Sequence, residues 1–92
     1  VIPHNVQLYQ NYPNPFNPST VISFDLSNPQ NVTLQIYDVL GNLVQTLVNK
    51  KILSTGVHQY KWNPENHLSS GTYFYMLQTN KEIVTNKMTL IK

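Results

Sequence analysis

The side chains that could carry acid–base, nucleophilic or metal chemistry are few and scattered along this chain. Its three histidines are His4, His58 and His67. Their spacing does not match that of metal ligands, and no Gly-x-Ser-x-Gly elbow frames a serine. Asp25 and Asp38 could join backbone carbonyls around a calcium ion, but no Asp-rich loop surrounds them. Asp38 is better interpreted as a hydrogen-bond acceptor in a turn before Gly41. The sequence therefore predicts no enzyme, no bound metal and no cofactor.

The composition also argues against nucleic-acid binding and cysteine chemistry. Of the 92 residues only 11% are charged, against a usual share of about 25%. All six basic residues are Lys, which lacks the planar fork with which Arg reads phosphates and base edges. Cysteine is absent, which excludes disulfides, thiolate nucleophiles and Cys-ligated zinc. No apolar run approaches the roughly 18 residues that span a membrane, and a first residue other than Met fits a piece of a longer protein.

Alternating apolar and polar residues predict short β-strands along most of the chain. The stretches that alternate, or are β-prone throughout, are residues 21–26, 32–37, 43–48, 57–62, 72–79 and 83–91. The stretch 43–48 also fits a helical stripe, but its brevity and β-branched residues favour a strand. Residues 72–79 are apolar on both faces, which is typical of a central strand. The first ten residues have no clear period, and residues 49–55 are expected to form a loop.

Turn residues separate these stretches at intervals of about 8–12 residues, which is typical of an all-β sandwich. Gly41, Gly56 and Gly71 supply turn geometry, and Asn80-Lys81 is a candidate two-residue hairpin. The sequence therefore predicts one domain, an immunoglobulin-like antiparallel β-sandwich of about seven strands, with a small closed barrel as the alternative. The side chains expected on the inward faces are Ile22, Phe24, Leu26, Val32, Leu34, Ile36 and Trp62.

The most unusual stretch, called here the proline strap, is Tyr12-Pro13-Asn14-Pro15-Phe16-Asn17-Pro18-Ser19-Thr20. Each proline fixes φ at about −65° and removes a backbone donor, so we expect a stiff, non-helical segment. Asn14, Asn17 and Ser19 can close turns on the backbone. We interpret the strap as a lid in which Tyr12 and Phe16 plug one end of the sandwich. Direct contact of the strap with a binding partner is the alternative.

Several motifs, in order along the chain, resemble those of one bacterial family. They are Leu8 to Thr20, then Ile36-Tyr37-Asp38 with Gly41, Gly56-Val57-His58 with Trp62, Ser70 to Tyr75, and Lys87 to Lys92. Each motif is weak by itself, whereas their order and spacing together are specific. On these residues the chain resembles the type A C-terminal sorting domain of the type IX (Por) secretion system of Bacteroidota and their relatives. The motif residues singled out are Tyr12, Pro13, Asn14, Pro15, Phe16, Asn17, Pro18, Asp38, Gly41, Gly56, Trp62, Gly71 and Tyr73.

The resemblance implies a non-catalytic export signal with a small Ig-like fold. Such domains follow a secreted cargo protein, fold in the periplasm, and are recognised by the outer-membrane type IX translocon, which exports the cargo to the cell surface or the medium. A sortase-like protease then commonly cuts upstream, and this cut would fall in or before residues 1–7 here. Residues 1–10 would be the end of a linker to the cargo and the start of the domain, and residues 11–92 the sorting domain.

The resemblance also places the recognition segment in the last strand, Glu82 to Lys92. The candidate residues for contact with the translocon are Lys87, Met88, Leu90, Ile91 and Lys92. The strand could pair with a receptor edge through main-chain hydrogen bonds, and Lys81, Lys87 and Lys92 could steer it toward an acidic groove. Because a terminal strand can be an uncovered edge, a monomer, an edge-paired dimer and a swapped dimer all stay open.

Two other functions stay open from the sequence. An Ig-like carbohydrate-binding module would need exposed coplanar aromatic rings. Tyr60 and Trp62 are the candidates for such a platform, although core packing is the simpler interpretation of both. A structural spacer is the other function, since the chain also resembles, at a distance, the Ig-like domain of the flagellar hook-capping protein. A spacer should work anywhere in its host protein, whereas a sorting signal should work only at the C-terminus.

Overall fold

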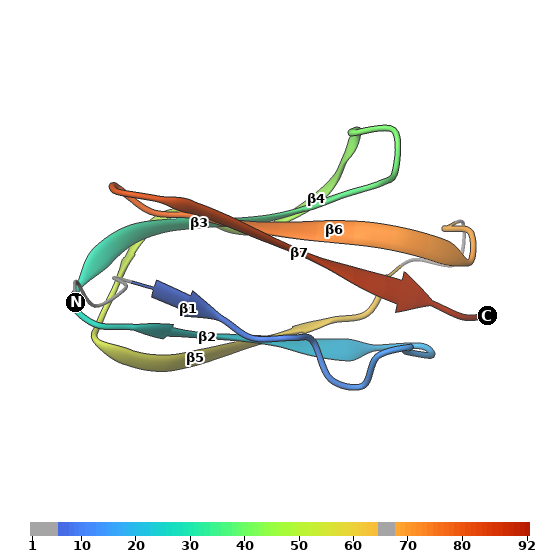
Figure 1. The fold of residues 1–92 in the computed structure, drawn as a ribbon, viewed down its shortest axis with the longest axis horizontal. Helices are drawn as coiled ribbons and strands as arrows, with labels where there is room; N and C mark the ends of the chain where they lie inside the picture. The colour runs from blue at the N-terminus through green and yellow to red at the C-terminus, as the bar shows by residue number, and fades with distance from the viewer. Residues whose placement is uncertain (1–5, 65–67) are drawn as a thin grey trace.

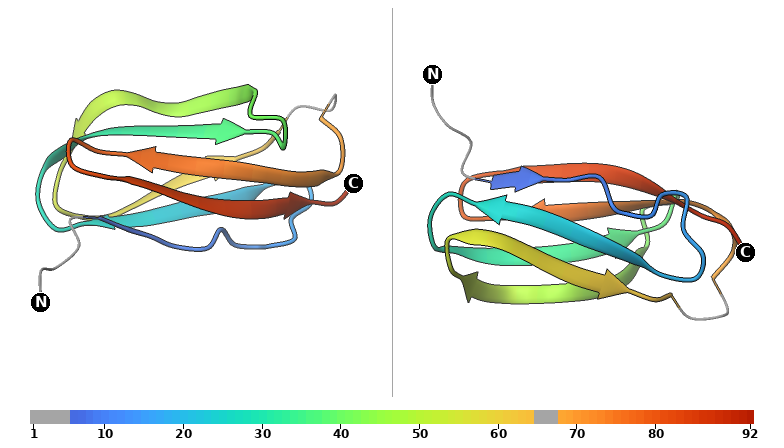
Figure 2. Two further views of the ribbon diagram at one scale, coloured as in Figure 1. Left: turned by 45° about the horizontal axis from the view of Figure 1, so that its top comes forward. Right: turned by 90° about the horizontal axis from the view of Figure 1, so that it is seen from below.

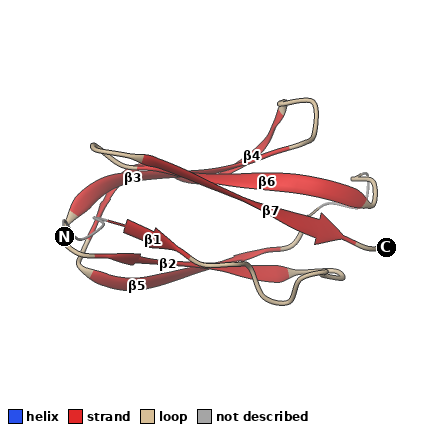
Figure 3. Cartoon of the chain, viewed as in Figure 1, coloured by secondary structure: helices blue, strands red, loops and turns tan. Residues whose placement is uncertain are grey.

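Two antiparallel sheets face each other and enclose the core (Figures 1 and 3). The computed structural model describes residues 6–64 and 68–92; His4, His67 and the first half of the predicted linker lie outside these ranges. The strands are β1 (Val6–Leu8), β2 (Thr20–Leu26), β3 (Gln30–Tyr37), β4 (Leu43–Leu53), β5 (Gly56–Trp62), β6 (Gly71–Gln78) and β7 (Ile83–Leu90). The described ranges contain no helix, and thus none that could cross a membrane.

The strand order is that of an immunoglobulin-like sandwich, which confirms the predicted fold class over the closed barrel. One sheet has the order β1-β2-β5 and the other the order β4-β3-β6-β7. Figure 2 (right) shows the three-stranded layer in blue, cyan and yellow in front of the four-stranded layer. The first, second and fifth strands share a sheet in Ig folds, and the third, sixth and seventh share the other. The strands run along the longest of the molecule's dimensions, which are 40 × 23 × 22 Å.

The core consists of the inward faces that alternation predicts. Because side chains along a strand alternate between its two faces, β2 and β3 each place every second residue in the interior. The predicted inward side chains are all buried: Ile22, Phe24, Leu26, Val32, Leu34, Ile36 and Trp62. Strand β6 lies between β3 and β7, as a segment that is apolar on both faces should.

Two strands differ from the sequence prediction. Strand β1 forms in a segment without a period, because three residues are too few to establish one and pairing with β2 supplies the order. Strand β4 continues through the predicted loop to Leu53. Its pairing with β3 shifts register at three places, and Lys50 has φ of 48° there. Such bulges add residues that break the alternation, which hides the strand from pattern analysis.

The predicted turns are present. Positive φ occurs at all three glycines: 85° at Gly41, 119° at Gly56 and 148° at Gly71. The β6–β7 connection is centred on Asn80-Lys81, and Thr79 N donates to Glu82 O across it (2.9 Å). Glu82 N in turn donates to the Thr79 side-chain oxygen (3.3 Å).

Candidate functional site

The proline strap crosses from one sheet to the other on the side of the sandwich where β1 and β7 lie (Figure 1). Tyr12 and Val21 of β2 exchange two backbone hydrogen bonds, of 3.0 and 2.9 Å. Further along, Phe16 N donates to Thr89 O (2.9 Å) and Ile91 N donates to Phe16 O (3.0 Å). The chain therefore pairs first with the three-stranded sheet and then with β7 of the other sheet. The three Xaa-Pro bonds within it are cis.

A buried polar pair holds the two ends of the strap together. Asn11 Nδ2 donates to Thr20 Oγ1 (3.0 Å) and to Pro13 O (3.1 Å), and Thr20 Oγ1 donates to the same carbonyl (2.9 Å). Asn11 N donates to the Tyr75 hydroxyl (2.9 Å), and burial raises the pKa of Tyr75. Buried polar groups require such partners. Sequence reasoning did not single out Asn11 or Thr20, whose only signal was a polar residue at each end of the motif.

The two aromatic rings of the strap have different environments, so the predicted lid is half right. Phe16 is 1% exposed and its ring lies 5.7 Å from that of Trp62. Trp62 meets Tyr73 edge-on at 6.0 Å, so Phe16 plugs the end of an aromatic cluster as predicted. Tyr12, however, is 80% exposed. Its backbone pairs with β2, and this pairing directs the side chain away from the core. The other exposed motif residues of the strap are Pro13, Asn14, Pro15, Asn17 and Pro18.

The aromatic residues of β5 face the interior. Trp62 is buried and its indole Nε1 donates to Gln45 Oε1 (2.9 Å). The Tyr60 ring stacks on buried Phe24 at 6.0 Å with an interplanar angle of 7°. These two residues therefore do not form an exposed sugar platform, and the core interpretation of Trp62 is confirmed.

Residues 6–16 bond to the outer edge of β7 and to Glu82 directly before it, and the bonds to the β7 backbone lie in its C-terminal half. We call this contact the β7 seam. Besides the two bonds of Phe16, the edge is linked by Val6 N to Glu82 Oε1 (3.1 Å), Gln10 Nε2 to Lys87 O (2.9 Å) and Thr89 N to Asn14 Oδ1 (3.0 Å). A receptor strand that paired with the C-terminal half of this edge would have to displace the strap, because Thr89 N and O and Ile91 N already have partners. The expectation of a freely available edge is thus wrong for this half of β7.

The five candidate recognition residues of the last strand divide between the core and the surface. Met88 and Leu90 are each 1% exposed and lie in the hydrophobic core. Lys87, Ile91 and Lys92 are exposed, and Lys92 N donates to Ser70 Oγ (2.9 Å), which holds the end of the chain beside β6. Direct contact with a partner is therefore open to the second group, while the first group fixes the position of the strand.

The predicted group of three lysines near the C-terminus does not exist in space. Lys81 lies in the turn between β6 and β7, and this turn lies at the opposite end of the sandwich from the C-terminus (Figure 1). Because β7 is extended, proximity in sequence does not bring Lys81 close to Lys92. Of the three lysines, Lys87 and Lys92 remain in the C-terminal half of the last strand and at its end.

Asp38 accepts hydrogen bonds within the β3–β4 turn, as the sequence predicts. Its Oδ1 accepts from Asn42 N (2.9 Å) and Leu40 N (3.0 Å), and its carbonyl oxygen accepts from Gly41 N (3.1 Å). The bond from Asn42 N lowers the pKa of Asp38 from its ordinary value of 3.8. In residues 6–64 and 68–92, no group of three His, Asp or Glu side chains is placed to hold a metal ion.

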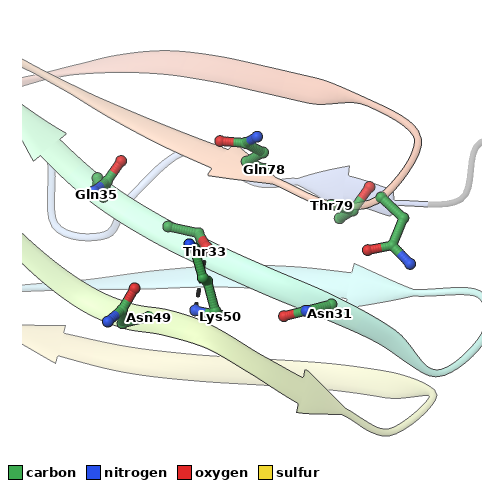
Figure 4. A pocket seen from close by; sticks show the side chains of 8 residues that line it. Asn31, Thr33, Gln35, Asn49, Lys50, Gln78 and Thr79 are labelled. Carbon is green, nitrogen blue, oxygen red and sulfur yellow. Dashed lines mark hydrogen bonds between the residues drawn. The ribbon is translucent and has the colours of Figure 1, made fainter.

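A shallow polar depression of about 430 Å³ lies on the outer face of the four-stranded sheet (Figure 4). Its lining consists of amide and hydroxyl side chains and one cation: Asn31, Thr33, Gln35, Asn49, Lys50, Gln78, Thr79 and Asn80. Lys50 N donates to Thr33 Oγ1 (3.2 Å) at the bulge of β4. Such a surface can exchange hydrogen bonds with a hydroxylated ligand, but none of the singled-out motif residues lies in it.

Solved structures that are similar to this chain include a bacterial and a mammalian protein. The first is PorZ, described as an essential bacterial surface component of the type IX secretion system of Porphyromonas gingivalis. Its TM-score is 0.65 at 21% identity, and the match covers 92% of this chain and 11% of PorZ. The second is the Ig1 domain of mouse SynCAM 2, with a TM-score of 0.43 at 17% identity, covering 78% of this chain and 79% of that one. The PorZ match supports the fold, and this chain spans about a tenth of PorZ.

No curated protein matches the sequence. A family model does match, and its description is "Secretion system C-terminal sorting domain". The match runs over residues 10–92, which include the strap, the β7 strand and all thirteen motif residues that the sequence singled out. The chain is therefore a member of the secretion system C-terminal sorting domain family.

Proposed function

We propose that this domain is a folded, non-catalytic sorting signal that directs a fused cargo protein through the outer-membrane type IX translocon to the cell surface or the medium. The observation that carries the proposal is the family match over residues 10–92. The domain would fold in the periplasm and be read there as a rigid surface. A small sandwich suits this role because its exposed side chains stay at fixed positions relative to one another.

The positions of the two ends of the chain support recognition of the domain at the end of the sandwich where Lys92 lies. Val6 N is bonded to Glu82 Oε1 beside the β6–β7 turn, so the chain enters the sandwich at the end opposite to Lys92 (Figure 1). The long axis of the molecule is 40 Å. A receptor that contacts Lys87, Ile91 and Lys92 would therefore approach from the side that is remote from the cargo.

We further propose that the domain proper begins at Val6 and that the sortase-like protease cuts before this residue. Val6 is buried and pairs with Leu26. A cut before Val6 would leave the seam intact, whereas a cut between Leu8 and Tyr12 would separate β1 from the strap. This refines the expected boundary, in which residues 1–10 are both the end of the linker and the start of the domain.

The test is a reporter fusion in a bacterium with the type IX system. The chain is attached to the C-terminus of a fluorescent protein, and fluorescence is measured in the periplasm, at the surface and in the medium. Deleting Glu82 to Lys92 would also remove buried Met88 and Leu90, so charge reversal is the sharper change. We expect the double variant K87E/K92E to lower the exported fraction while the double variant K51E/K81E, at exposed lysines of β4 and of the β6–β7 turn, leaves it unchanged.

The outcomes test the sorting function and the contact role of the two lysines separately. Reporter that stays in the periplasm with the unmodified chain, although the host exports its own cargo, would overturn the sorting function. Normal export of both double variants would leave the function standing but would remove the contact role of Lys87 and Lys92. Moving the chain to the middle of the reporter should abolish export, because a sorting signal should work only at the C-terminus. A structural spacer, in contrast, should tolerate relocation.

A carbohydrate-binding function finds support only in the polar depression, because Trp62 is buried. Its test is a titration of ¹⁵N-labelled protein with cellohexaose, mannohexaose and maltohexaose. Shifts confined to the amides of the depression would favour this function, and unchanged spectra would exclude it for these sugars.

A further inference from the structure

The sandwich uses some strap residues for packing and leaves others without a structural task. Phe16 fills the core, and Asn11 and Thr20 hold the ends of the strap. Tyr12 has a large ring in the same motif, yet it is 80% exposed. The next most exposed aromatic side chain in the described ranges is Tyr9 at 36%. Stability therefore does not explain why an aromatic residue stands at position 12.

Tyr12 is held firmly although its side chain is exposed. Its N–H and C=O both bond to Val21. The following carbonyl, that of Pro13, accepts from both Asn11 and Thr20. Pro13 itself restricts the backbone directly after the ring. A Tyr side chain has only two χ angles to order, so a ring on such a frame loses little conformational entropy when it is bound.

The exposed ring is joined to the strand that the sorting function uses. Gln10 bonds to Lys87 O on one side of Tyr12, and Asn14 bonds to Thr89 N on the other. The strap and the outer edge of β7 are thus hydrogen-bonded neighbours. A partner that reaches the C-terminal half of β7 is within reach of the strap, because Phe16 of the strap bonds through its backbone to Thr89 and Ile91.

We propose that Tyr12 is an anchor of the sorting signal, which inserts its ring into an apolar pocket of the type IX receptor while β7 supplies the exposed cations. The proposal rests on the sorting function. Rigid exposed Tyr side chains are enriched among the few residues that dominate the energy of protein interfaces. The signal is then composite, with one part at the start of the domain and the other at its end, joined by the seam.

The experiment uses the same reporter fusion with three single variants. Tyr12→Ser removes the ring, Tyr12→Phe keeps it, and Ile52→Ser is the matched control. Ile52 is 74% exposed and lies on β4, at the other edge of the sheet from β7. Because the substituted side chains are exposed, all three purified variants should melt within about 2 °C of the unmodified domain.

We expect Tyr12→Ser to lower the exported fraction about tenfold or more at limiting receptor, as the loss of an interface anchor does. Tyr12→Phe and Ile52→Ser should export as the unmodified domain does. Normal export of Tyr12→Ser would overturn the anchor, and a loss with Tyr12→Phe would overturn the apolar pocket. An export defect of Ile52→Ser as large as that of Tyr12→Ser would also overturn it, since any exposed apolar side chain would then matter. Failure of the unmodified fusion would count against the sorting function instead.

Discussion

The two long sides of the sandwich protect their strand edges in different ways. On one side, residues 6–16 bond to the outer edge of β7 and close its C-terminal half. On the other side, β4 is an edge strand whose pairing with β3 shifts register at three places, with a left-handed Lys50 and exposed Lys51. Both arrangements prevent the regular, open edge that invites pairing with another chain.

The difference lies in where the protection comes from. Strand β4 carries its own protection, because its register shifts and its lysines lie within a single stretch of sequence. Strand β7 depends on a segment more than seventy residues away, since Gln10 and Lys87 are 77 positions apart. A change in the strap should therefore alter β7, while β4 stays as it is. The following predictions, from the largest expected effect to the smallest, test this asymmetry.

The largest effect is expected from Phe16→Ala. Removing a buried ring that contacts Trp62 should lower the free energy of unfolding by about 3–5 kcal/mol. Amide exchange should also speed up at Thr89 and Ile91, which lose their anchored partner, and stay slow in β4. Urea denaturation and hydrogen exchange measure the two effects. A loss under about 1 kcal/mol would show that the ring does not lock the strap, and Tyr12→Ala serves as the exposed control.

A smaller effect is expected from Asn11→Ala. The substitution removes the amide that bonds to Thr20 and Pro13, and the loss of a buried hydrogen-bonding group costs about 1–3 kcal/mol. Exposed Asn49 of β4 is the matched position on the other side of the molecule. Asn49→Ala should change the free energy of unfolding by less than about 0.5 kcal/mol. Equal losses from the two variants, measured by urea denaturation, would contradict the structural role of Asn11.

On the β4 side, substituting glycine for each of two neighbouring lysines should change the stability of the domain in opposite directions. Lys50 has φ of 48°, a conformation that costs a residue with a Cβ about 1 kcal/mol or more, so Lys50→Gly should stabilise the domain slightly. The described positive-φ residues do not include Lys51, and glycine in an ordinary strand position costs about 0.5–1 kcal/mol. Thermal melts of K50G and K51G check the signs. A destabilised K50G would mean that the bulge does not strain the backbone.

The smallest effect is the pH dependence that Asp38 contributes. Hydrogen bonds, first that from Asn42 N, hold the pKa of this carboxyl below its ordinary value of 3.8. A lowered pKa in the folded state adds stability above the ordinary value, and this stability is lost as the pH falls through the folded pKa. The Tm of the unmodified domain should therefore fall more between pH 5 and about pH 3 than that of Asp38→Asn. Parallel Tm curves would contradict the role of the carboxylate in the turn.

Pattern analysis identified most strands and the sandwich class but was weaker for the candidate site. Ile22, Phe24 and Leu26 alternate strictly and are buried, because the two-residue period belongs to the strand itself. The prolines predict a stiff strap, and the sequence predicts that Phe16 plugs one end of the sandwich. The exposure of Tyr12 could not be foreseen, since both rings flank similar Pro-Asn sequences.

The sequence by itself determined the strands with a clear period, the inward faces, the Gly and Asp38 turns and the family motifs. These features are local, because φ preferences, alternation and side-chain turns depend on a few neighbouring residues. Only the tertiary structure decided which of the two strap rings is buried and that the C-terminal half of the β7 edge is closed. These depend on where segments 64 to 77 residues apart meet, and the backbone groups that meet there, being common to every residue, leave no pattern in the sequence.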